Sequence, residues 1–476
     1  MTADGRSFET RVTGALADPQ LQQALGNVRR NFIERRAAAK SALPEWGALS
    51  DEAKAIKDHV LAHLDVYLEA YERAATANGA KVHWAATAAD AREIILRLCQ
   101  EAGARTVTKG KSMVAEEIHL NQHLEANGIT PVETDLGEYI IQLRGEMPSH
   151  IIAPAVHLTK AQVEADFRKA HTHLPMGRSM VEPRELVAEA RGILRDKFIA
   201  ADVGITGANF LIAETGTSVI VTNEGNGDLT QVLPRVHVVI TSIEKVMPTL
   251  EDVSVILRLL ARSATGQEIS TYTTFSTGPK RPGDPDGPEA YHVVILDNGR
   301  SEMLGTPLQP VLRCIRCGAC MNHCPVYQAI GGHAYGAVYA GPIGAVLTPA
   351  LDGVMAAKDL PNASSFCGRC EEVCPMQIPL PGMMRHFREE QVRMAQTPAG
   401  QRVGLALWAW LALHPKIYRL ASRAGTRVLE MAGGKKGRMR WLPLAGGWTR
   451  HRDLPSPEGR TFHDLWAERQ RLKSRT

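Results

Sequence analysis

The sequence has no apolar run long enough to cross a lipid bilayer. Its longest strongly apolar stretch, residues 405–413 (LALWAWLAL), has nine residues, whereas a membrane-spanning helix needs about 20. No apolar signal-peptide core follows Met1, so secretion is not expected. We therefore expect no transmembrane segment, and the apolar stretch with its two tryptophans is a candidate for docking on a partner protein.

Glycine signatures of nucleotide-binding folds are also missing. No GxGxxG fingerprint follows a predicted strand, which argues against a nicotinamide or flavin bound to this chain. The loop Lys109-Gly110-Lys111-Ser112 has lysines before a predicted helix, but the full glycine spacing of a P-loop is absent. The loop is still compatible with binding an anionic group at the start of this helix.

Positive charge is concentrated near the C-terminal end. The whole chain has a formal net charge of +4, yet residues 385–476 hold 19 Lys and Arg against 7 Asp and Glu. These basic residues are interspersed with apolar residues at helical spacing, and no stacking-aromatic platform accompanies them. We therefore expect no nucleic-acid binding. A solvated face or an acidic partner-protein surface is the expected use.

Cysteine is scarce outside two short runs. Seven of the eight cysteines fall in these runs, and both runs end in Cys-Pro: C-x2-C-x2-C-x3-C-P from Cys314, and C-x2-C-x3-C-P from Cys367. This spacing is typical of ferredoxin-type iron–sulfur binding. A zinc site does not account for the third cysteine and the x3-Cys-Pro ending, and a disulfide framework is typical of small secreted domains. The free thiolates that clusters require favour a cytoplasmic location.

The spacing also predicts how the cysteines divide between two clusters. In paired runs of this kind, the last cysteine of each run ligates the cluster held mainly by the other run. We therefore expect one cluster on Cys314, Cys317, Cys320 and Cys374. The other is expected on Cys324, Cys367 and Cys370.

The second group is one cysteine short of the four that a [4Fe–4S] cluster takes. Ser364 stands where the missing cysteine would be. Ser364 could supply an alkoxide ligand, water or another molecule could fill the place, or the cluster could be a [3Fe–4S] form. A serine that only caps a helix is an equally good interpretation. Two clusters are expected, with [4Fe–4S] as the expected type.

Hydrophobic periodicity divides the chain into four regions. Residues 1–75 have helical spacing, and residues 76–300 alternate short β-rich segments with helices, which predicts an open α/β sheet with parallel strands. Residues 301–395 are expected to form an α-helical ferredoxin-type domain, followed by a basic helical region at 396–476. Strands are predicted near residues 81–84, 104–108 and 130–134.

Polar loops of the α/β region are candidates for a ligand site, because loops at the carboxyl ends of parallel strands form the crevice of such sheets. Simple turns explain their Gly, Thr and Asn content equally well. The candidate residues are Lys109, Lys111, Ser112, Glu214, Thr215, Asn223, Glu224 and Asn226.

Six motifs together resemble one known family. Their order and number, which cover nearly the whole chain, are similar to those of the iron–sulfur subunit of lactate-utilization proteins, the LutB/LldF family with its LUD domain. The motifs are TKGKSMVAEEIHLN, ETDLGEYIIQL, GITGANFLIAETGTSVIVTNEGN, CIRCGACMNHCPVY, IGGHAYGAVYAGPIGAVLTP and SSFCGRCEEVCP.

The resemblance implies a function and a fold. Family members are thought to act with two partner proteins in oxidising L-lactate to pyruvate, with this subunit passing electrons. The family's α/β domain is similar to the NagB/RpiA sugar-phosphate isomerase and CoA-transferase folds, and its members share the seven-cysteine arrangement. We therefore expect an electron-transfer component of an oxidoreductase complex. Two alternatives stay open. In the first, the α/β domain is itself catalytic, binds lactate or a thioester and uses Glu224 or Lys111. In the second, the chain is an assembly scaffold whose clusters only stabilise its structure.

Overall fold

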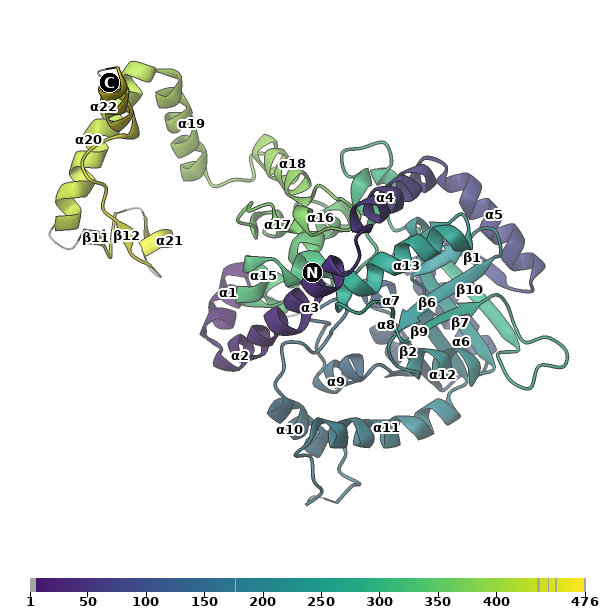
Figure 1. Ribbon diagram of the computed structural model, residues 1–476. Helices are drawn as coiled ribbons and strands as arrows, with labels where there is room; N and C mark the ends of the chain where they lie inside the picture. The colour runs from purple at the N-terminus through teal and green to yellow at the C-terminus, as the bar shows by residue number, and fades with distance from the viewer. Residues whose placement is uncertain (1–5, 176, 435–436, 444, 450–451, 475–476) are drawn as a thin grey trace. The chain divides into compact units, whose positions relative to one another are not determined.

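The structure is a computed structural model that describes residues 6–175, 177–434, 437–443, 445–449 and 452–474. The chain divides into two compact units, Met1–Glu390 and Gln391–Thr476. The first unit contains the N-terminal helices, the α/β region and both cysteine runs (Figure 1).

The N-terminal region is helical, which confirms the prediction. In its last helix, Leu64, Leu68, Tyr71 and Ala75 are buried at the spacing of one helix face, so this face packs against the sheet that follows. The helices are α1 (Phe8–Ala17), α2 (Pro19–Val28), the π-helix η1 (Arg29–Glu34), α3 (Arg35–Ser41), α4 (Trp46–Ala62) and α5 (Leu64–Ala77).

A six-stranded parallel sheet forms the centre of the α/β region, as the alternating pattern predicts. The three strands predicted from the sequence are found as β1, β2 and β3. In spatial order the strands are β1 (Lys81–Ala85), β10 (Ala290–Leu296), β7 (Val236–Ser242), β4 (Val203–Gly207), β2 (Thr106–Gly110) and β3 (Thr130–Glu133).

Both faces of this sheet are covered by helices. Along β7, Val238 and Ile240 join the core under α6 (Ala88–Glu101) and α8 (Leu120–Ala126), whereas Val239 joins the core under α5. Because successive strand side chains point to opposite faces, β7 is apolar on both sides. The remaining helices are α7 (Met113–Glu117), α9 (Leu136–Arg144), α10 (Lys160–Ala170), α11 (Pro183–Ala200), α12 (Asn226–Val232) and α13 (Leu250–Ala264).

A smaller mixed sheet lies beside the first. Its spatial order is β8 (Val246–Met247), β5 (Phe210–Ile212), β6 (Thr217–Thr222) and β9 (Tyr272–Ser276). Phe210, Ile212 and Val219 of this sheet join a core that continues into the cysteine-rich region. In Figure 1, α10 and α11 lie at the far end of the unit from α4 and α5.

The cysteine-rich region consists of short helices and shares its core with the N-terminal helices. Trp46 of α4, Ile256 of α13 and Tyr327 belong to one continuous apolar cluster, which explains why residues 1–390 form one compact unit. The elements are η3 (Ser301–Met303), η4 (Gln309–Arg313), α14 (Ala319–Asn322), α15 (Pro325–Ile330), η5 (His333–Tyr335), α16 (Gly341–Asp352), η6 (Leu360–Asn362), α17 (Arg369–Glu372) and α18 (Leu380–Arg393).

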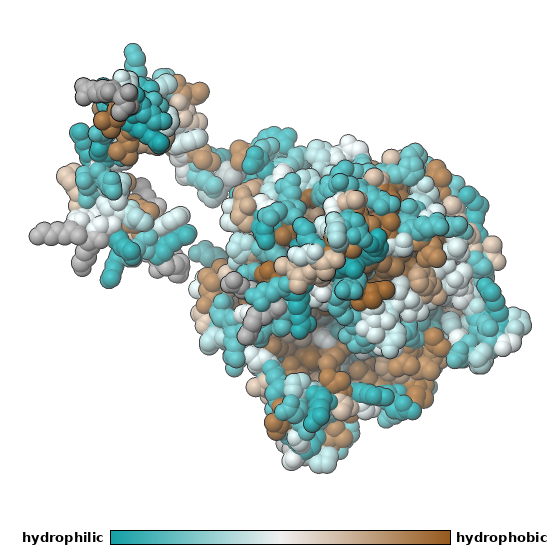
Figure 2. All heavy atoms as spheres, viewed as in Figure 1, coloured by the Kyte–Doolittle hydropathy of each residue, from teal (hydrophilic) through white to brown (hydrophobic). Residues whose placement is uncertain are grey.

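The second unit is small and exposes much of its apolar surface. None of the residues of its first helix is buried, and Trp408 is 62% exposed. Figure 2 shows hydrophobic and hydrophilic residues mixed on the face in view. No described helix of the chain is long and apolar enough to span a membrane. The elements are α19 (Ala399–Leu413), α20 (Pro415–Gly433), β11 (Arg438–Met439), α21 (Gly446–Thr449), β12 (Leu454–Pro455) and α22 (Phe462–Lys473).

Candidate metal centres and an adjoining cavity

Four cysteines from the two runs line one small cavity. Its volume is ≈ 20 Å³, and Cys314, Cys317, Cys320 and Cys374 contribute to its wall. The other side chains of the wall are mostly apolar, and all four cysteines are free thiols. Burial raises the pKa of Cys317 to about 12 and that of Cys374 to about 11. Converging, unbridged thiols that are buried or half-buried fit a metal centre that displaces the thiol protons when it binds.

Backbone amides of the loops point at two of these sulfur atoms. The N–H of Arg316 donates to Sγ of Cys314 at 3.4 Å, and the N–H of Ile378 donates to Sγ of Cys374 at 3.5 Å. Arg316 has φ +60° and Gly318 has φ +71°, so the first loop turns twice through the left-handed region. Amides aimed at sulfur stabilise the thiolate form.

The other three cysteines form a second group. Cys324 and Cys370 are buried, whereas Cys367 is exposed. Burial, with contributions from the negative charges of Cys324 and Cys367, raises the pKa of Cys370 to about 12. Burial likewise raises the pKa of Cys324, with a contribution from Cys367. The three sulfur atoms therefore lie close enough to repel one another as thiolates.

The two runs repeat the same backbone conformation. Phe366 has φ +54° and Gly368 has φ +80°, which corresponds to Arg316 and Gly318 in the first run. A four-residue helix follows each turn, α14 in the first run and α17 in the second. By this correspondence, Ser364 takes the place of Cys314.

Ser364 forms the same local contact as its cysteine counterpart. The N–H of Phe366 donates to Oγ of Ser364 at 3.1 Å, as the N–H of Arg316 does to the sulfur of Cys314. The next helix, α17, begins after Gly368, so Ser364 does not cap it. Nη2 of Arg388 donates to the carbonyl oxygen of Ser364 at 3.2 Å and holds the segment in place.

A second, larger cavity of ≈ 420 Å³ lies at the carboxyl ends of the parallel strands. Ser112 follows β2, Asn209 follows β4 and Lys245 follows β7, and all three line the cavity. Arg316 and Tyr339 of the cysteine-rich region line it as well. Because Arg316 contributes to the walls of both cavities, the large cavity adjoins the first cysteine group.

Half of the polar residues predicted as ligand-site candidates line this cavity. They are Lys111, Ser112, Asn223 and Glu224. Glu214 and Thr215 instead lie in the turn between β5 and β6, and Asn226 begins α12, where its Oδ1 accepts from the N–H of Gly227 at 2.9 Å.

Lys109 and Lys111 have different surroundings although they are two residues apart. Nζ of Lys109 is buried between Glu116 at 2.6 Å and Glu133 at 2.8 Å, and it does not line the cavity. Lys111 lies at the strand end with φ +59°, and its ammonium pairs with Asp135 and with Glu224, the latter at 3.0 Å. Both lysines therefore have carboxylate partners.

Glu138 is a buried acid on the same side of the cavity. Its Oε2 accepts from the N–H of Lys111 at 3.2 Å, and it lines the cavity. Burial raises the pKa of Glu138 well above its ordinary value, and repulsion from Glu133 and Asp135 adds to the rise. This group therefore holds a proton more readily than an exposed glutamate does.

A buried charge network connects the cavity to the cysteine loop. Arg300 is fully buried and pairs with Glu117 at 2.6 Å and with Glu244 at 3.1 Å. Glu244 also lies 3.6 Å from Nη2 of Arg316, whose guanidinium stacks 4.7 Å above the ring centre of Tyr339.

The hydroxyl of Tyr339 completes this network, because it donates to Glu117 at 2.7 Å. Burial would raise the pKa of Glu244, but Arg300, Lys245 and Arg316 outweigh it and hold the pKa at about 2. The carboxylate is therefore ionised.

Two buried lysines accompany the network. Lys57 donates through Nζ to the carbonyl oxygen of Glu244, and Lys245 lines the cavity while only 7% exposed. Burial and the neighbouring charge of Lys245 lower the pKa of Lys57 to about 8. Burial and the neighbouring charge of Arg316 lower the pKa of Lys245 to about 8 as well.

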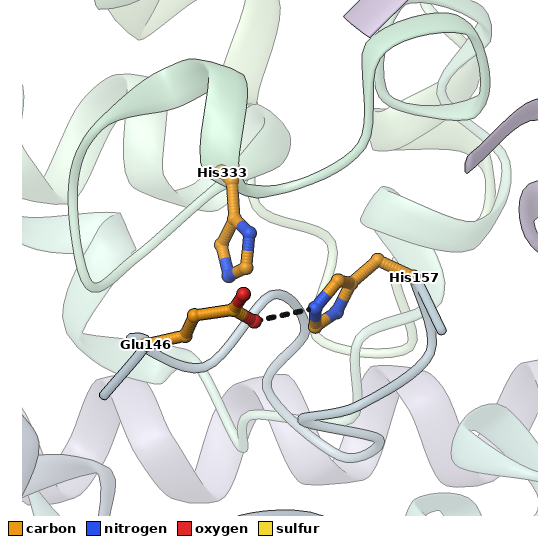
Figure 3. Close-up of side chains that lie close together, drawn as sticks. All are labelled: Glu146, His157 and His333. Atoms are coloured by element: carbon orange, nitrogen blue, oxygen red, sulfur yellow. Dashed lines mark hydrogen bonds and ion pairs between the residues drawn. The ribbon is translucent and has the colours of Figure 1, made fainter. Parts of the chain in front are cut away.

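Glu146, His157 and His333 form a polar cluster where the α/β region meets η5. Figure 3 shows the three side chains converging, with Nε2 of His157 2.9 Å from the carboxylate of Glu146. Their ligand atoms lie within 4.8 Å of one another, which is compatible with a metal ion. The carboxylate, however, is already paired with Arg144 at 2.8 Å, and Nε2 of His333 bonds to the carbonyl oxygen of Met147 at 2.7 Å. We interpret the cluster as a hydrogen-bonded contact that holds the α/β region and the cysteine-rich region together.

Sequence reasoning missed the cationic side of the large cavity. Arg316 lies inside the first cysteine run, and its charge between two cysteines was the available signal. Tyr339 lies inside the motif IGGHAYGAVYAGPIGAVLTP, but nothing in that motif marked it as a cavity residue, and Lys245 lies outside every motif; only packing brings the two to the cavity.

Three family models match most of the chain from residue 68 onward. Residues 68–296 match the model described as LUD domain, residues 310–378 match the 4Fe-4S dicluster domain, and residues 385–471 match the C-terminal model of lactate utilisation protein B. The curated relatives include Lactate utilization protein B of Bacillus pumilus, 40% identical over 99% of both chains. This chain belongs to the lactate utilization protein B family.

Other relatives support the same assignment. Lactate utilization protein B of Bacillus subtilis is 41% identical over 98% of this chain and 96% of its own. A protein of Escherichia coli named Uncharacterized electron transport protein YkgF is 40% identical over 97% of both chains. A solved structure of a DUF162 family protein from Deinococcus radiodurans aligns with 49% of this chain and 98% of its own. The sequence identity is 16% and the TM-score is 0.26, which does not establish a shared fold.

Proposed function

We propose that this chain is the iron–sulfur electron-transfer subunit of a complex that oxidises L-lactate to pyruvate with two partner proteins. One structural observation carries the proposal: cysteines of two separate runs line a single cavity. The match of residues 310–378 to a 4Fe-4S dicluster domain and the names of the relatives support it.

The proposal assigns the ligands as the spacing predicts. Cys314, Cys317, Cys320 and Cys374 would hold one [4Fe–4S] cluster, and Cys324, Cys367 and Cys370 would hold the other, with Ser364 at the fourth position. Such clusters supply one-electron redox chemistry when bound. The chain's own residues supply the thiolates, the amides directed at sulfur and the apolar walls that keep water from the first group.

Three further points belong to the proposal. The parallel sheet in the order β1-β10-β7-β4-β2-β3 supports a NagB/RpiA-like fold for the α/β region. Regions 1–75, 76–300, 301–395 and 396–476 would act as the four functional parts. Free, unbridged cysteines support a cytoplasmic location.

Replacing Cys317 by Ser tests the proposal. In anaerobically purified protein, the Cys317→Ser variant should lose the broad visible iron–sulfur absorbance and its lactate-dependent reduction in the presence of the partner proteins. The matched control is Cys99→Ala, which removes a buried thiol outside both groups and should keep the full absorbance. Iron and acid-labile sulfide are measured in both variants. Lactate-dependent electron flow in the cluster-free Cys317→Ser protein would overturn the proposal.

A further inference from the structure

We propose that the large cavity binds a small monocarboxylate, with its anionic group between the side chains of Lys245 and Arg316. The inference rests on the proposed function, because it gives the 2-hydroxy acid or its 2-keto product a place beside the first cysteine group. The cavity has a volume of ≈ 420 Å³, within the range of small-molecule sites.

The position of the cavity is that of a ligand crevice. It opens where β2, β4 and β7 end, and the carboxyl ends of parallel strands are the usual ligand side of such sheets. Arg316, which stands between Cys314 and Cys317, contributes to its wall. A ligand in the cavity therefore lies near the loop that carries two of the proposed cluster ligands.

The buried charges near this wall are not balanced. The network and its lysines contain four basic side chains but only two carboxylates, Glu117 and Glu244. The basic residues are Lys57, Lys245, Arg300 and Arg316. A buried excess of positive charge is costly unless an anion compensates it. Cys314 lies near Lys245 and Arg316 on one side, and the cavity is open to an anion on the other.

Two cationic groups face the cavity without a full set of partners. Nη1 of Arg316 is buried, and no described residue accepts a hydrogen bond from it. Nζ of Lys245 has no carboxylate within ion-pair distance among the described residues. Lys111, which also lines the cavity, is already paired with Asp135 and Glu224. An anion is therefore directed to the side of the cavity next to the cysteines.

The remaining wall suits a short, partly polar chain. Oδ1 of Asn209 accepts from the N–H of Val221 at 2.9 Å, which leaves its Nδ2 donor for another partner, and Ser112 also lines the cavity. Leu260, Ala261 and Ala264 of α13 supply an apolar side. This combination fits a carboxylate with a hydroxyl or keto oxygen on the neighbouring carbon.

Calorimetric titration of the anaerobically purified full chain tests the inference. The titrants are L-lactate, D-lactate and pyruvate, with propionamide as an uncharged control. Wild-type protein should bind at least one of the acids and not the amide. The Lys245→Met variant should weaken that binding at least tenfold with unchanged cluster absorbance. The matched control Lys280→Met, at a surface lysine 3.6 Å from Glu289, should bind as wild type does.

A second variant tests the location by shape instead of charge. Ala264→Leu fills the cavity from α13 and leaves every charge in place, so it should also abolish binding. Saturating acid should change the EPR line shape of the reduced wild-type protein, because the acid would lie against the first cysteine loop. The inference is overturned if the wild-type protein binds none of the acids, or if both variants bind as tightly as wild type.

The carboxylate site and the proposed electron-transfer function can fail independently of one another. Iron content and reduction by dithionite are measured on the same samples. Intact, reducible clusters without acid binding would overturn the carboxylate site alone. Protein without iron and sulfide would overturn the electron-transfer proposal, whatever the titration shows.

Discussion

The N–H of Phe366 donates to Oγ of Ser364 at 3.1 Å, in a turn that repeats the conformation of the first cysteine loop. The contact places a hydroxyl where the first run has the thiol of Cys314. With the proposed ligands, the second cluster would have three thiolates and an oxygen atom at its fourth corner. A cluster iron without a thiolate exchanges its ligand or leaves more readily than one held by cysteine.

The Ser364→Cys variant should complete the second cluster. We expect its iron content to rise to that of two [4Fe–4S] clusters, and any three-iron EPR signal of the air-oxidised protein to disappear. Ser365→Cys, which adds a thiol at the next position, is the control and should leave both measurements unchanged. Equal spectra for wild type and Ser364→Cys would show that the serine does not occupy a ligand position.

Removal of Arg300 should destabilise the first unit strongly. Arg300→Met leaves Glu117 and Glu244 buried without their shared cation, and the loss of one partner from a buried ion pair costs about 3–5 kcal/mol. Urea unfolding under anaerobic conditions measures the change. Arg73→Met breaks an exposed pair with Glu69 and should change stability by no more than about 0.5 kcal/mol. Equal effects of the two variants would contradict the network.

Gly332 should not tolerate a methyl group. A Cβ atom at this position would lie 1.8 Å from the carbonyl oxygen of Ser149, so Gly332→Ala must separate the cysteine-rich region from the α/β region. We expect a loss of about 1–3 kcal/mol and a lower yield of cluster-containing protein. A Cβ atom at Gly382 in α18 would have no neighbouring atom within 4 Å. Gly382→Ala should therefore be neutral or stabilising by up to about 1 kcal/mol. Similar melting temperatures for both variants would refute the close contact.

Acid should weaken the sheet through His237. Burial lowers the pKa of this histidine to about 3, with a contribution from His292. The unfolded chain therefore takes up a proton near pH 6.5, whereas the folded chain does not, and stability falls as the pH drops below 6.5. Proton uptake by His237 in the unfolded chain should lower the free energy of unfolding by about 2 kcal/mol between pH 6.5 and about pH 5.

Thermal unfolding followed by circular dichroism across this pH range measures the effect. His237→Gln should flatten the pH dependence, because Gln can still bond to Thr206, which now lies 2.8 Å from Nε2 of the histidine. The control His173→Gln, at an exposed position, should keep the wild-type slope. An unchanged slope in His237→Gln would contradict the assignment.

Local patterns in the sequence determined the secondary structure and the fold class. Periodicity predicted the N-terminal helices and the strands found as β1, β2 and β3, because helix and strand spacing depend on residues a few positions apart. The repeat of Cys-Pro endings also predicts how the cysteines divide between two clusters, because that prediction needs only the spacing; the division itself stays a prediction.

Only the tertiary structure decided which polar residues share a site. Lys109 and Lys111 look equivalent in the sequence, yet one is enclosed by Glu116 and Glu133 and the other reaches the cavity at the strand end. Lys245 and Arg316 come together because β7 is central in the sheet and the first cysteine loop packs against its carboxyl end. Such convergence depends on strand order and long-range packing, which no pattern of neighbouring residues specifies.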